Sequence, residues 1–318
     1  MQTLDHEVLQ RLAVWLARGE SPWLCTIVQT SGSSPRPVGS MLGALATGEQ
    51  VGTVSGGCVE EDLLERIGAG EFSGQSPQRV DYGVSAQENE RLGLPCGGKL
   101  VLLIEQLNTG DSDWIAATLT AISQRQCVER HLNLDTSATQ IRAVSHFTSL
   151  ALSSNGLQHC FGPRMRMLLI GAGQLAQSLS ELALAMDYEV IVSDPRQNML
   201  DQWMGPQLKL LQGMPDDIIR KHASDRHSVI ITLTHDPRID DMALMEALCT
   251  DAWYVGALGS PRTTQKRLER LAQLDISVEQ LARLHAPVGL AIGSKTPLEI
   301  SVAIMAELTQ LRRAPPSL

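Results

Sequence analysis

The chain has 318 residues and a mass of 34.5 kDa, which exceeds what one hydrophobic core usually serves, so its length predicts two domains. Its 26 Lys and Arg residues against 35 Asp and Glu residues give a formal net charge of −9, and only 3% of its residues are aromatic. Because nucleic-acid-binding proteins concentrate cations and stacking rings, this composition excludes that class.

The N-terminal composition and the hydropathy along the chain predict a protein that is neither exported nor membrane-spanning. Asp5, His6 and Glu7 stand where a secretory signal would carry basic residues, and the apolar positions from Val8 to Leu16 recur at helical spacing. No segment approaches the roughly 18 to 20 apolar residues that a membrane span needs. We therefore expect a cytoplasmic protein with no membrane partner, whose six cysteines are free thiols because no CxxC pair indicates a zinc site.

Residues 1–162 have the pattern of a smaller N-terminal α+β domain. Seven glycines between positions 32 and 57, interleaved with apolar runs, favour short strands and tight turns. Periodicity then predicts helices at 59–67 and 113–126, a strand at 99–105 and hairpin strands within 127–162. We place the boundary near Gly162-Pro163-Arg164.

Residues 163–318 change to alternating strands and helices, which predicts an α/β fold with a Rossmann-like parallel sheet. Ser260-Pro261 and Thr296-Pro297 mark two further helix starts, each with a hydroxyl cap and a proline. The expected strands are 167–170, 189–193, 208–211, 229–232 and 253–255, and the expected helices are 174–186 and 239–249.

A glycine loop follows the first of these strands. Gly171-Ala172-Gly173-Gln174-Leu175-Ala176 matches the G-x-G-x-x-G/A pattern of dinucleotide-binding loops, and Asp194 ends the next strand, where a carboxylate would accept ribose hydroxyls. This pattern predicts a phosphate site at Gly171 and Gly173. The alternative is a loop that keeps its glycines for helix packing and binds no nucleotide.

His235 and Asp236 follow the strand at 229–232, at the edge of the sheet where ligands bind, so they are candidate acid, base or cofactor contacts. Asp240 and Asp241 lie just downstream, and a divalent metal at these carboxylates stays open. The alternative is that Asp236-Pro237 forms a turn and that Asp240-Asp241 begins a helix.

Two cysteines lie beside glycine pairs, which expose backbone amides. Cys58 follows Gly56-Gly57 at a predicted helix start, and Cys96 precedes Gly97 and Gly98, three residues before Lys99. Both settings favour a thiolate, so both cysteines are candidate soft ligands or nucleophiles, although a small buried filler is the alternative. The other four are expected to be core residues, namely Cys25, Cys127, Cys160 and Cys249.

A further glycine-rich loop carries Ser33-Ser34-Pro35-Arg36-Pro37. Hydroxyls and a rigid Pro-Arg-Pro suit an anion-contacting loop in which Arg36 would bind a phosphate or carboxylate. The alternative is a surface loop stiffened by its prolines.

Taken together, these segments and three later motifs resemble the xanthine dehydrogenase accessory protein family, also called XdhC/CoxI, in the same order along almost the whole chain. The segments are Gly32-Ser33-Ser34-Pro35-Arg36, Gly56-Gly57-Cys58-Val59-Glu60, Cys96-Gly97-Gly98, Gly171-Ala172-Gly173, Thr234-His235-Asp236, Tyr254-Val255-Gly256-Ala257-Leu258-Gly259-Ser260 and His285-Ala286-Pro287-Val288-Gly289-Leu290.

The resemblance implies a chaperone that is non-catalytic or weakly catalytic. Such a protein binds the molybdenum cofactor (molybdopterin), protects it while a cysteine desulfurase converts a metal oxo ligand to sulfido, and delivers it to a xanthine dehydrogenase-type molybdenum hydroxylase. It also implies that one cysteine of the first domain lies near molybdenum, with Cys96 as first choice and Cys58 as second.

Two other hypotheses stay open. The Gly171 loop with Asp194 fits an NAD(P)-dependent oxidoreductase acting on a small substrate, or a site for another nucleotide. Alternatively, the second domain serves only as a dimerisation scaffold. We expect a homodimer because symmetric dimers are the commonest oligomers. Cofactor form, client enzyme and nucleotide binding are not decided by the sequence.

Overall fold

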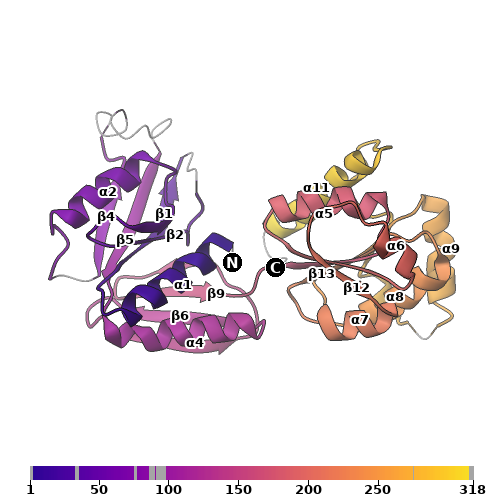
Figure 1. Cartoon of the computed structure of the whole chain (residues 1–318), viewed down its shortest axis with the longest axis horizontal. Helices are drawn as coiled ribbons and strands as arrows, with labels where there is room; N and C mark the ends of the chain where they lie inside the picture. Colours follow the sequence, from indigo (N-terminus) through magenta and orange to yellow (C-terminus); the bar gives the residue numbers. More distant parts are fainter. Residues whose placement is uncertain are drawn as a thin grey trace. The chain divides into compact units, whose positions relative to one another are not determined.

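The computed structural model describes residues 3–32, 36–74, 77–85, 90, 98–274 and 276–314. The chain divides into two compact units, Met1–Pro163 and Arg164–Leu318 (Figure 1). In the described ranges, every helix is too short or too polar to pass through a membrane.

The first unit contains a five-stranded antiparallel sheet in the order β3-β2-β1-β5-β4. Helix α2 (Cys58–Gly68) packs on one face of this sheet through Val59, Leu63 and Ile67. The strands are β1 (Trp23–Ser31), β2 (Met41–Ala44), β3 (Gln50–Gly52), β4 (Gln78–Tyr82) and β5 (Lys99–Gln106).

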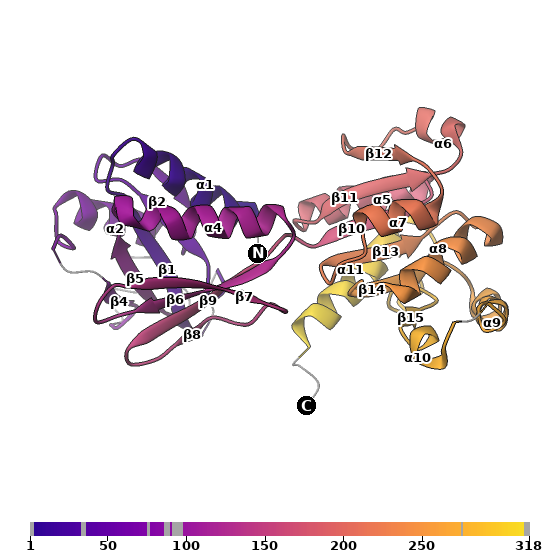
Figure 2. The ribbon, with the colours of Figure 1, turned by 90° about the horizontal axis from the view of Figure 1, so that it is seen from below.

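A four-stranded antiparallel sheet in the order β7-β6-β9-β8 completes this unit together with two long helices that pack side by side. Figure 2 shows both helices on the same side of the unit. The elements are α1 (Thr3–Ala17), the 3₁₀ turn η2 (Thr109–Asp111), α4 (Ser112–Ser123), β6 (Cys127–Asn133), β7 (Thr139–Val144), β8 (Ala151–Leu152) and β9 (Gly156–Phe161).

A buried ion pair joins the two sheets. Arg130 on β6 donates to Glu105 on β5 through Nη2 at 2.5 Å and Nη1 at 3.0 Å, and the two side chains are only 1% and 4% exposed. The guanidinium also lies 4.0 Å from the ring centre of Trp114 on α4. Opposite charge and ring contact together offset the cost of removing both ions from water.

The second unit is a three-layer fold around a six-stranded sheet in the order β12-β11-β10-β13-β14-β15, all parallel. This order reverses between β10 and β13, which is the position where open α/β sheets bind ligands. The strands are β10 (Arg166–Ile170), β11 (Glu189–Asp194), β12 (Lys209–Gln212), β13 (Ser228–Thr232), β14 (Tyr254–Ala257) and β15 (Leu284–His285).

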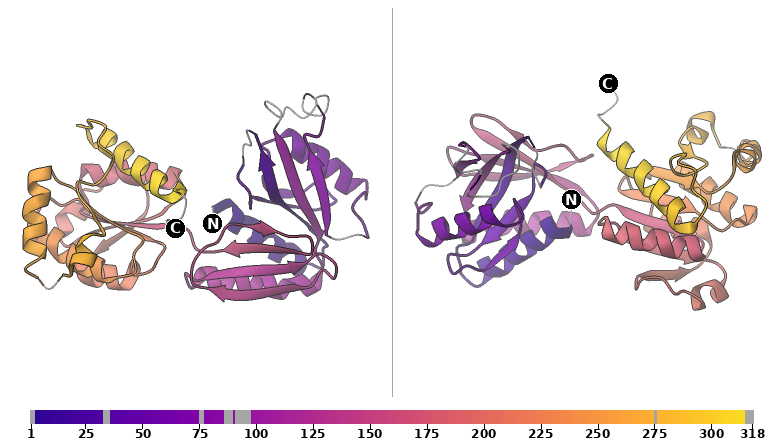
Figure 3. Two further views of the ribbon diagram at one scale, coloured as in Figure 1. Left: turned by 180° about the vertical axis from the view of Figure 1, so that it is seen from behind. Right: turned by 90° about the horizontal axis from the view of Figure 1, so that it is seen from above.

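Helices cover both faces of the parallel sheet. On one face α5 and α11 lie side by side, as Figure 3 shows, and bury residues such as Leu179 and Ile304 against Leu169 and Ile231. On the other face α7, α8 and α9 bury Ile219, Leu244 and Leu271. The helices are α5 (Gln174–Ala185), α6 (Gln197–Asp201), α7 (Pro215–His222), α8 (Pro237–Cys249), α9 (Pro261–Leu271), α10 (Val278–Leu281) and α11 (Pro297–Arg313).

The predicted α/β fold class is confirmed. A smaller N-terminal region of antiparallel sheets precedes a Rossmann-like parallel sheet. Both predicted helix starts are also confirmed, because Ser260 accepts from Thr263 N–H and Thr296 accepts from Glu299 N–H. The prediction that Cys249 is a core residue is wrong. It ends α8 on the solvent side of the helix, where Gln280 Nε2 lies 3.4 Å from its sulfur.

Candidate functional site

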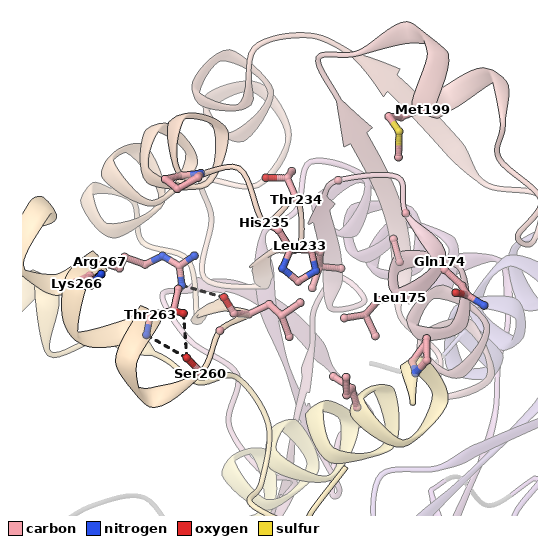
Figure 4. Close-up of a pocket in the computed structure, with 18 of the residues that line it drawn as sticks. Gln174, Leu175, Met199, Leu233, Thr234, His235, Ser260, Thr263, Lys266 and Arg267 are labelled. Carbon is pink, nitrogen blue, oxygen red and sulfur yellow. Dashed lines mark hydrogen bonds between the residues drawn. The ribbon is translucent and has the colours of Figure 1, made fainter. Parts of the chain in front are cut away.

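A pocket of about 990 Å³ lies in the second unit at the carboxyl ends of β10, β13 and β14 (Figure 4). The glycine loop and the first turn of α5 form one wall, and α9 forms the opposite wall. The segment before α11 and the first residues of that helix, Lys295, Pro297 and Ile300, complete the lining. The pocket therefore sits where the strand order reverses.

The two glycines of the loop, Gly171 and Gly173, have different structural roles. Gly171 has a φ of +113°, and a Cβ there would lie 2.9 Å from Thr234 Cγ2, so this position needs glycine for its backbone and its space. Gly173 caps α5, and a Cβ there would meet nothing within 4 Å, so open space adjoins the free amide groups of the helix. An anion fits this cradle. Ala176, the third motif position, is fully buried against the sheet.

Asp194 is not open to a ligand. It is fully buried, its Oδ2 accepts from Ala172 N–H at 3.1 Å, and Arg196 binds both oxygens at 2.8 and 2.9 Å. Burial alone would raise the pKa of Asp194, but the hydrogen bonds from Arg196 and Ala172 lower it below its usual value. The carboxylate thus anchors the glycine loop and presents Arg196, which is 39% exposed, at the pocket wall.

His235 lines the pocket, and Figure 4 shows its imidazole between the α9 side chains and Leu175. Its φ of +62° is uncommon for a residue with a side chain. Its two neighbours hold this conformation: Thr234 donates to Asp240 Oδ1 at 2.7 Å, and Asp236 caps α8 by accepting from Arg238 N–H. A strained, exposed imidazole in a pocket is a candidate ligand contact.

The Asp236 side chain is occupied by a neighbouring residue of the same helix start. Its carboxylate binds the Arg238 guanidinium at 2.9 and 3.1 Å, and these hydrogen bonds lower the pKa of Asp236 to about 2. It is not among the described residues that line the pocket. Asp240 is also internal, because it is 1% exposed and pairs with Arg267 at 3.2 Å.

Six cations and no carboxylate line the described pocket, in a chain whose net charge is −9. Arg267 and Arg270 are paired with Asp240 and Asp241, and Arg196 with Asp194. The remaining three form no ion pair with any residue that the structure describes: Arg262 and Lys266 on α9, and Lys295 before α11. The pocket therefore carries an unbalanced positive charge that favours anions.

The candidate residues of the first unit are described only in part. Cys96 and Gly97 lie outside the described residues, as does the side chain of Cys58, whose backbone begins α2. Gly98 is buried just before β5, and Arg36 is half-buried in its loop. The structure thus groups Gly171, Gly173 and His235 at one pocket, while these others belong to the other unit.

The loop before Cys58 already holds an anion of its own. The Glu60 carboxylate accepts hydrogen bonds from the N–H groups of Val54, Ser55, Gly56 and Gly57 at 2.8 to 3.0 Å, and also from the hydroxyls of Thr53 and Ser55. Burial opposes ionisation, but these bonds outweigh it and lower the pKa of Glu60 to about 2. The amides of Gly56 and Gly57 are consequently occupied by this chain's own side chain.

Sequence reasoning missed Arg196, Arg262, Lys266 and Lys295. A signal for two of them was present, because Arg262 and Lys266 are four residues apart just after the Ser260-Pro261 helix start, on one helical face. That spacing becomes informative only once α9 is known to border a pocket.

Comparisons with known proteins cover most of the chain. Residues 167–308 match a family model described as the XdhC Rossmann domain, and residues 15–83 match one described as the XdhC and CoxI family. The molybdenum cofactor insertion chaperone PaoD of Escherichia coli is 28% identical over 98% of this chain and 90% of its own length. A Bacillus subtilis protein named as a probable xanthine dehydrogenase subunit is 25% identical over 97% of each chain.

A solved structure is also similar over nearly the full length. The crystal structure of a xanthine dehydrogenase from Bacillus halodurans matches with a TM-score of 0.75 and 26% identity, covering 99% of this chain and 98% of that one. The relatives thus share both halves of the chain and their order.

Proposed function

Because this chain belongs to the XdhC and CoxI family, we propose that it is an accessory protein that binds the molybdenum cofactor and delivers it to a xanthine dehydrogenase-type molybdoenzyme. The relative named as a molybdenum cofactor insertion chaperone, which matches 98% of the chain, supports this role. In this proposal the protein is a chaperone, and it acts in the cytoplasm as a homodimer.

One observation carries the binding part of the proposal: the pocket of the second unit has an open glycine cradle and three cations without ion-pair partners in the described structure. The molybdenum cofactor carries a terminal phosphate, or a pyrophosphate in its dinucleotide form. The Gly173 amides and the first turn of α5 would hold that group. Arg196, held by Asp194, and His235 would contact the ligand beside it.

The molybdenum end of the cofactor requires a different protein ligand. Molybdenum bound by a dithiolene is a soft centre that a thiolate suits, and Cys96 is our first candidate and Cys58 our second. Among the described residues, no three His, Cys, Asp or Glu side chains cluster as a metal site. In this proposal the bound cofactor would stay accessible to a cysteine desulfurase, which would supply the sulfur for its sulfido ligand before delivery.

The test is retention of molybdenum. Purified protein is loaded with the cofactor, desalted, and assayed for molybdenum by mass spectrometry and for pterin by fluorescence after oxidation. We expect retention by the wild type, a marked loss in Cys96→Ala, and retention in Cys249→Ala, the matched control at an exposed cysteine. No retention by the wild type would refute the function, and equal retention by all variants, Cys58→Ala included, would refute the thiolate assignment.

An NAD(P)-dependent oxidoreductase is the second candidate, and the strand order with the glycine loop favours it. The geometry argues against this candidate, because Arg196 binds both oxygens of Asp194, the carboxylate expected to bind the ribose. Titration with NAD and NADP, followed by the fluorescence of Trp203 and Trp253, tests the oxidoreductase. No response to either nucleotide would leave the oxidoreductase without support.

A further inference from the structure

The positive charge of the pocket is concentrated away from the glycine loop. Arg262 and Lys266 project from the first turns of α9, and Lys295 precedes α11, whereas the phosphate cradle lies at Gly173 on the opposite wall. Figure 4 shows Lys266 and Thr263 across the pocket from Gln174. The cavity therefore offers two places that suit an anion, the glycine cradle on one wall and the cations on the other.

Neighbouring acids do not neutralise the region at α9. The Glu299 carboxylate accepts from the backbone N–H groups of Lys295 and Thr296 and so caps α11. Asp240 and Asp241 pair with Arg267 and Arg270. Arg267 also lines the pocket, but it is 3% exposed and its guanidinium is already paired: Nη2 lies 3.2 Å from Asp240 and Nε lies 3.6 Å from Asp241. In the described structure, the unpaired charge at this wall therefore belongs to Arg262, Lys266 and Lys295.

The fold fixes which part of a ligand would reach α9. In Rossmann-like units the nucleoside lies over the end of the second strand and the pyrophosphate lies at the glycine loop. Here β11 is that second strand, and Arg196 follows it. The other half of the ligand then extends over the ends of β13 and β14, where Ser260 begins α9.

We propose that Arg262, Lys266 and Lys295 form a second anion subsite, so that the pocket selects a dinucleotide whose half beyond the pyrophosphate is negatively charged. This inference rests on the proposed function for its natural ligand, the dinucleotide form of the molybdenum cofactor. A nicotinamide ring in its oxidised, cationic form meets repulsion at the same place.

Two commercial dinucleotides test the subsite directly. Nicotinic acid adenine dinucleotide differs from NAD only by a carboxylate in place of the ring amide, so the pair isolates one negative charge in the second half. We expect calorimetry to give roughly tenfold tighter binding of the acid form, because one added charge near several cations has about this effect. Equal binding of both, or no binding of either, would overturn the proposal.

Variants assign the effect to named residues. Lys266→Ala and Lys295→Ala should reduce the ratio of the two affinities toward one, whereas Gly173→Asp should weaken the binding of both dinucleotides. Lys221→Ala, at an exposed cation of α7 outside the pocket, is the matched control. Melting temperatures confirm that each variant folds. A ratio unchanged in Arg262→Ala, Lys266→Ala and Lys295→Ala alike would refute the assignment.

The two proposals fail separately. Molybdenum retention without preference for the acid dinucleotide refutes the subsite and leaves the chaperone role. Preference for the acid dinucleotide without molybdenum retention refutes the chaperone role and leaves the subsite.

Discussion

At the scale of single residues, charged side chains in this protein are used to hold loops as much as to meet ligands. Asp194, Asp236 and Glu60 each bind backbone N–H groups next to a predicted ligand position. From sequence alone, a carboxylate in such a position is interpreted as a ligand contact. Its spacing from the glycine motif is the same whether it binds a ligand or anchors a loop. Only the geometry distinguishes them.

The two loop glycines should respond to substitution in opposite ways. Gly171→Ala forces a side chain onto a φ of +113° and against Thr234, so we expect a loss of roughly 1–3 kcal/mol in unfolding free energy. Gly173→Asp has free space and should melt near the wild-type temperature, yet lose pyrophosphate binding because it adds a negative charge to the cradle. Thermal melts and calorimetry on both variants check this, and a stable Gly171→Ala would contradict it.

Glu60 should make stability depend on pH. Its folded pKa is about 2, below its usual value of 4.5, so its ionised form stabilises the fold above about pH 5 and this contribution is lost as pH falls toward 2. Glu60→Gln should therefore cost roughly 2 kcal/mol at neutral pH and progressively less in acid. Urea unfolding of both proteins at several values between about pH 3 and about pH 7 measures the difference, and a constant difference would contradict the prediction.

At the scale of elements, the second unit was the more predictable from sequence. The buried strands β10 and β13 carry continuous apolar runs at 167–170 and 229–231, and the Ser260 and Thr296 caps mark helix starts. Helix α7 escaped prediction because its eight residues offer only one apolar turn between charged ones. The cations of the pocket escaped because α9 and Lys295 meet the glycine loop only through tertiary packing.

The ion pair that joins β5 to β6 gives an element-scale prediction. Arg130→Met leaves Glu105 buried without its partner, and Glu105→Leu leaves Arg130 likewise, so each should cost about 3–5 kcal/mol. The double variant removes both charges and should be more stable than either single one. Chemical unfolding of the wild type and the three variants gives the coupling energy, and strictly additive losses would contradict the prediction.

At the scale of the whole molecule, a net charge of −9 surrounds a pocket lined by six cations. The overall field repels an anionic ligand, whereas the local groups attract it, and salt screens the first effect more than contacts at close range. Local attraction should still dominate at the site. We expect the pyrophosphate affinity to fall severalfold between about 50 and 300 mM salt, and an affinity that rises with salt would show that the overall field governs binding.

The hydrogen bonds from Arg196 occupy both oxygens of Asp194, and this has a practical consequence for chemical probes. If no carboxylate reads the ribose hydroxyls, those hydroxyls are free positions for derivatisation. Nucleotides with a fluorophore esterified at the 2′ or 3′ oxygen should therefore bind about as well as their parents, within roughly threefold. Such reporters would let occupancy of the pocket be followed in real time during transfer of cargo to a client enzyme.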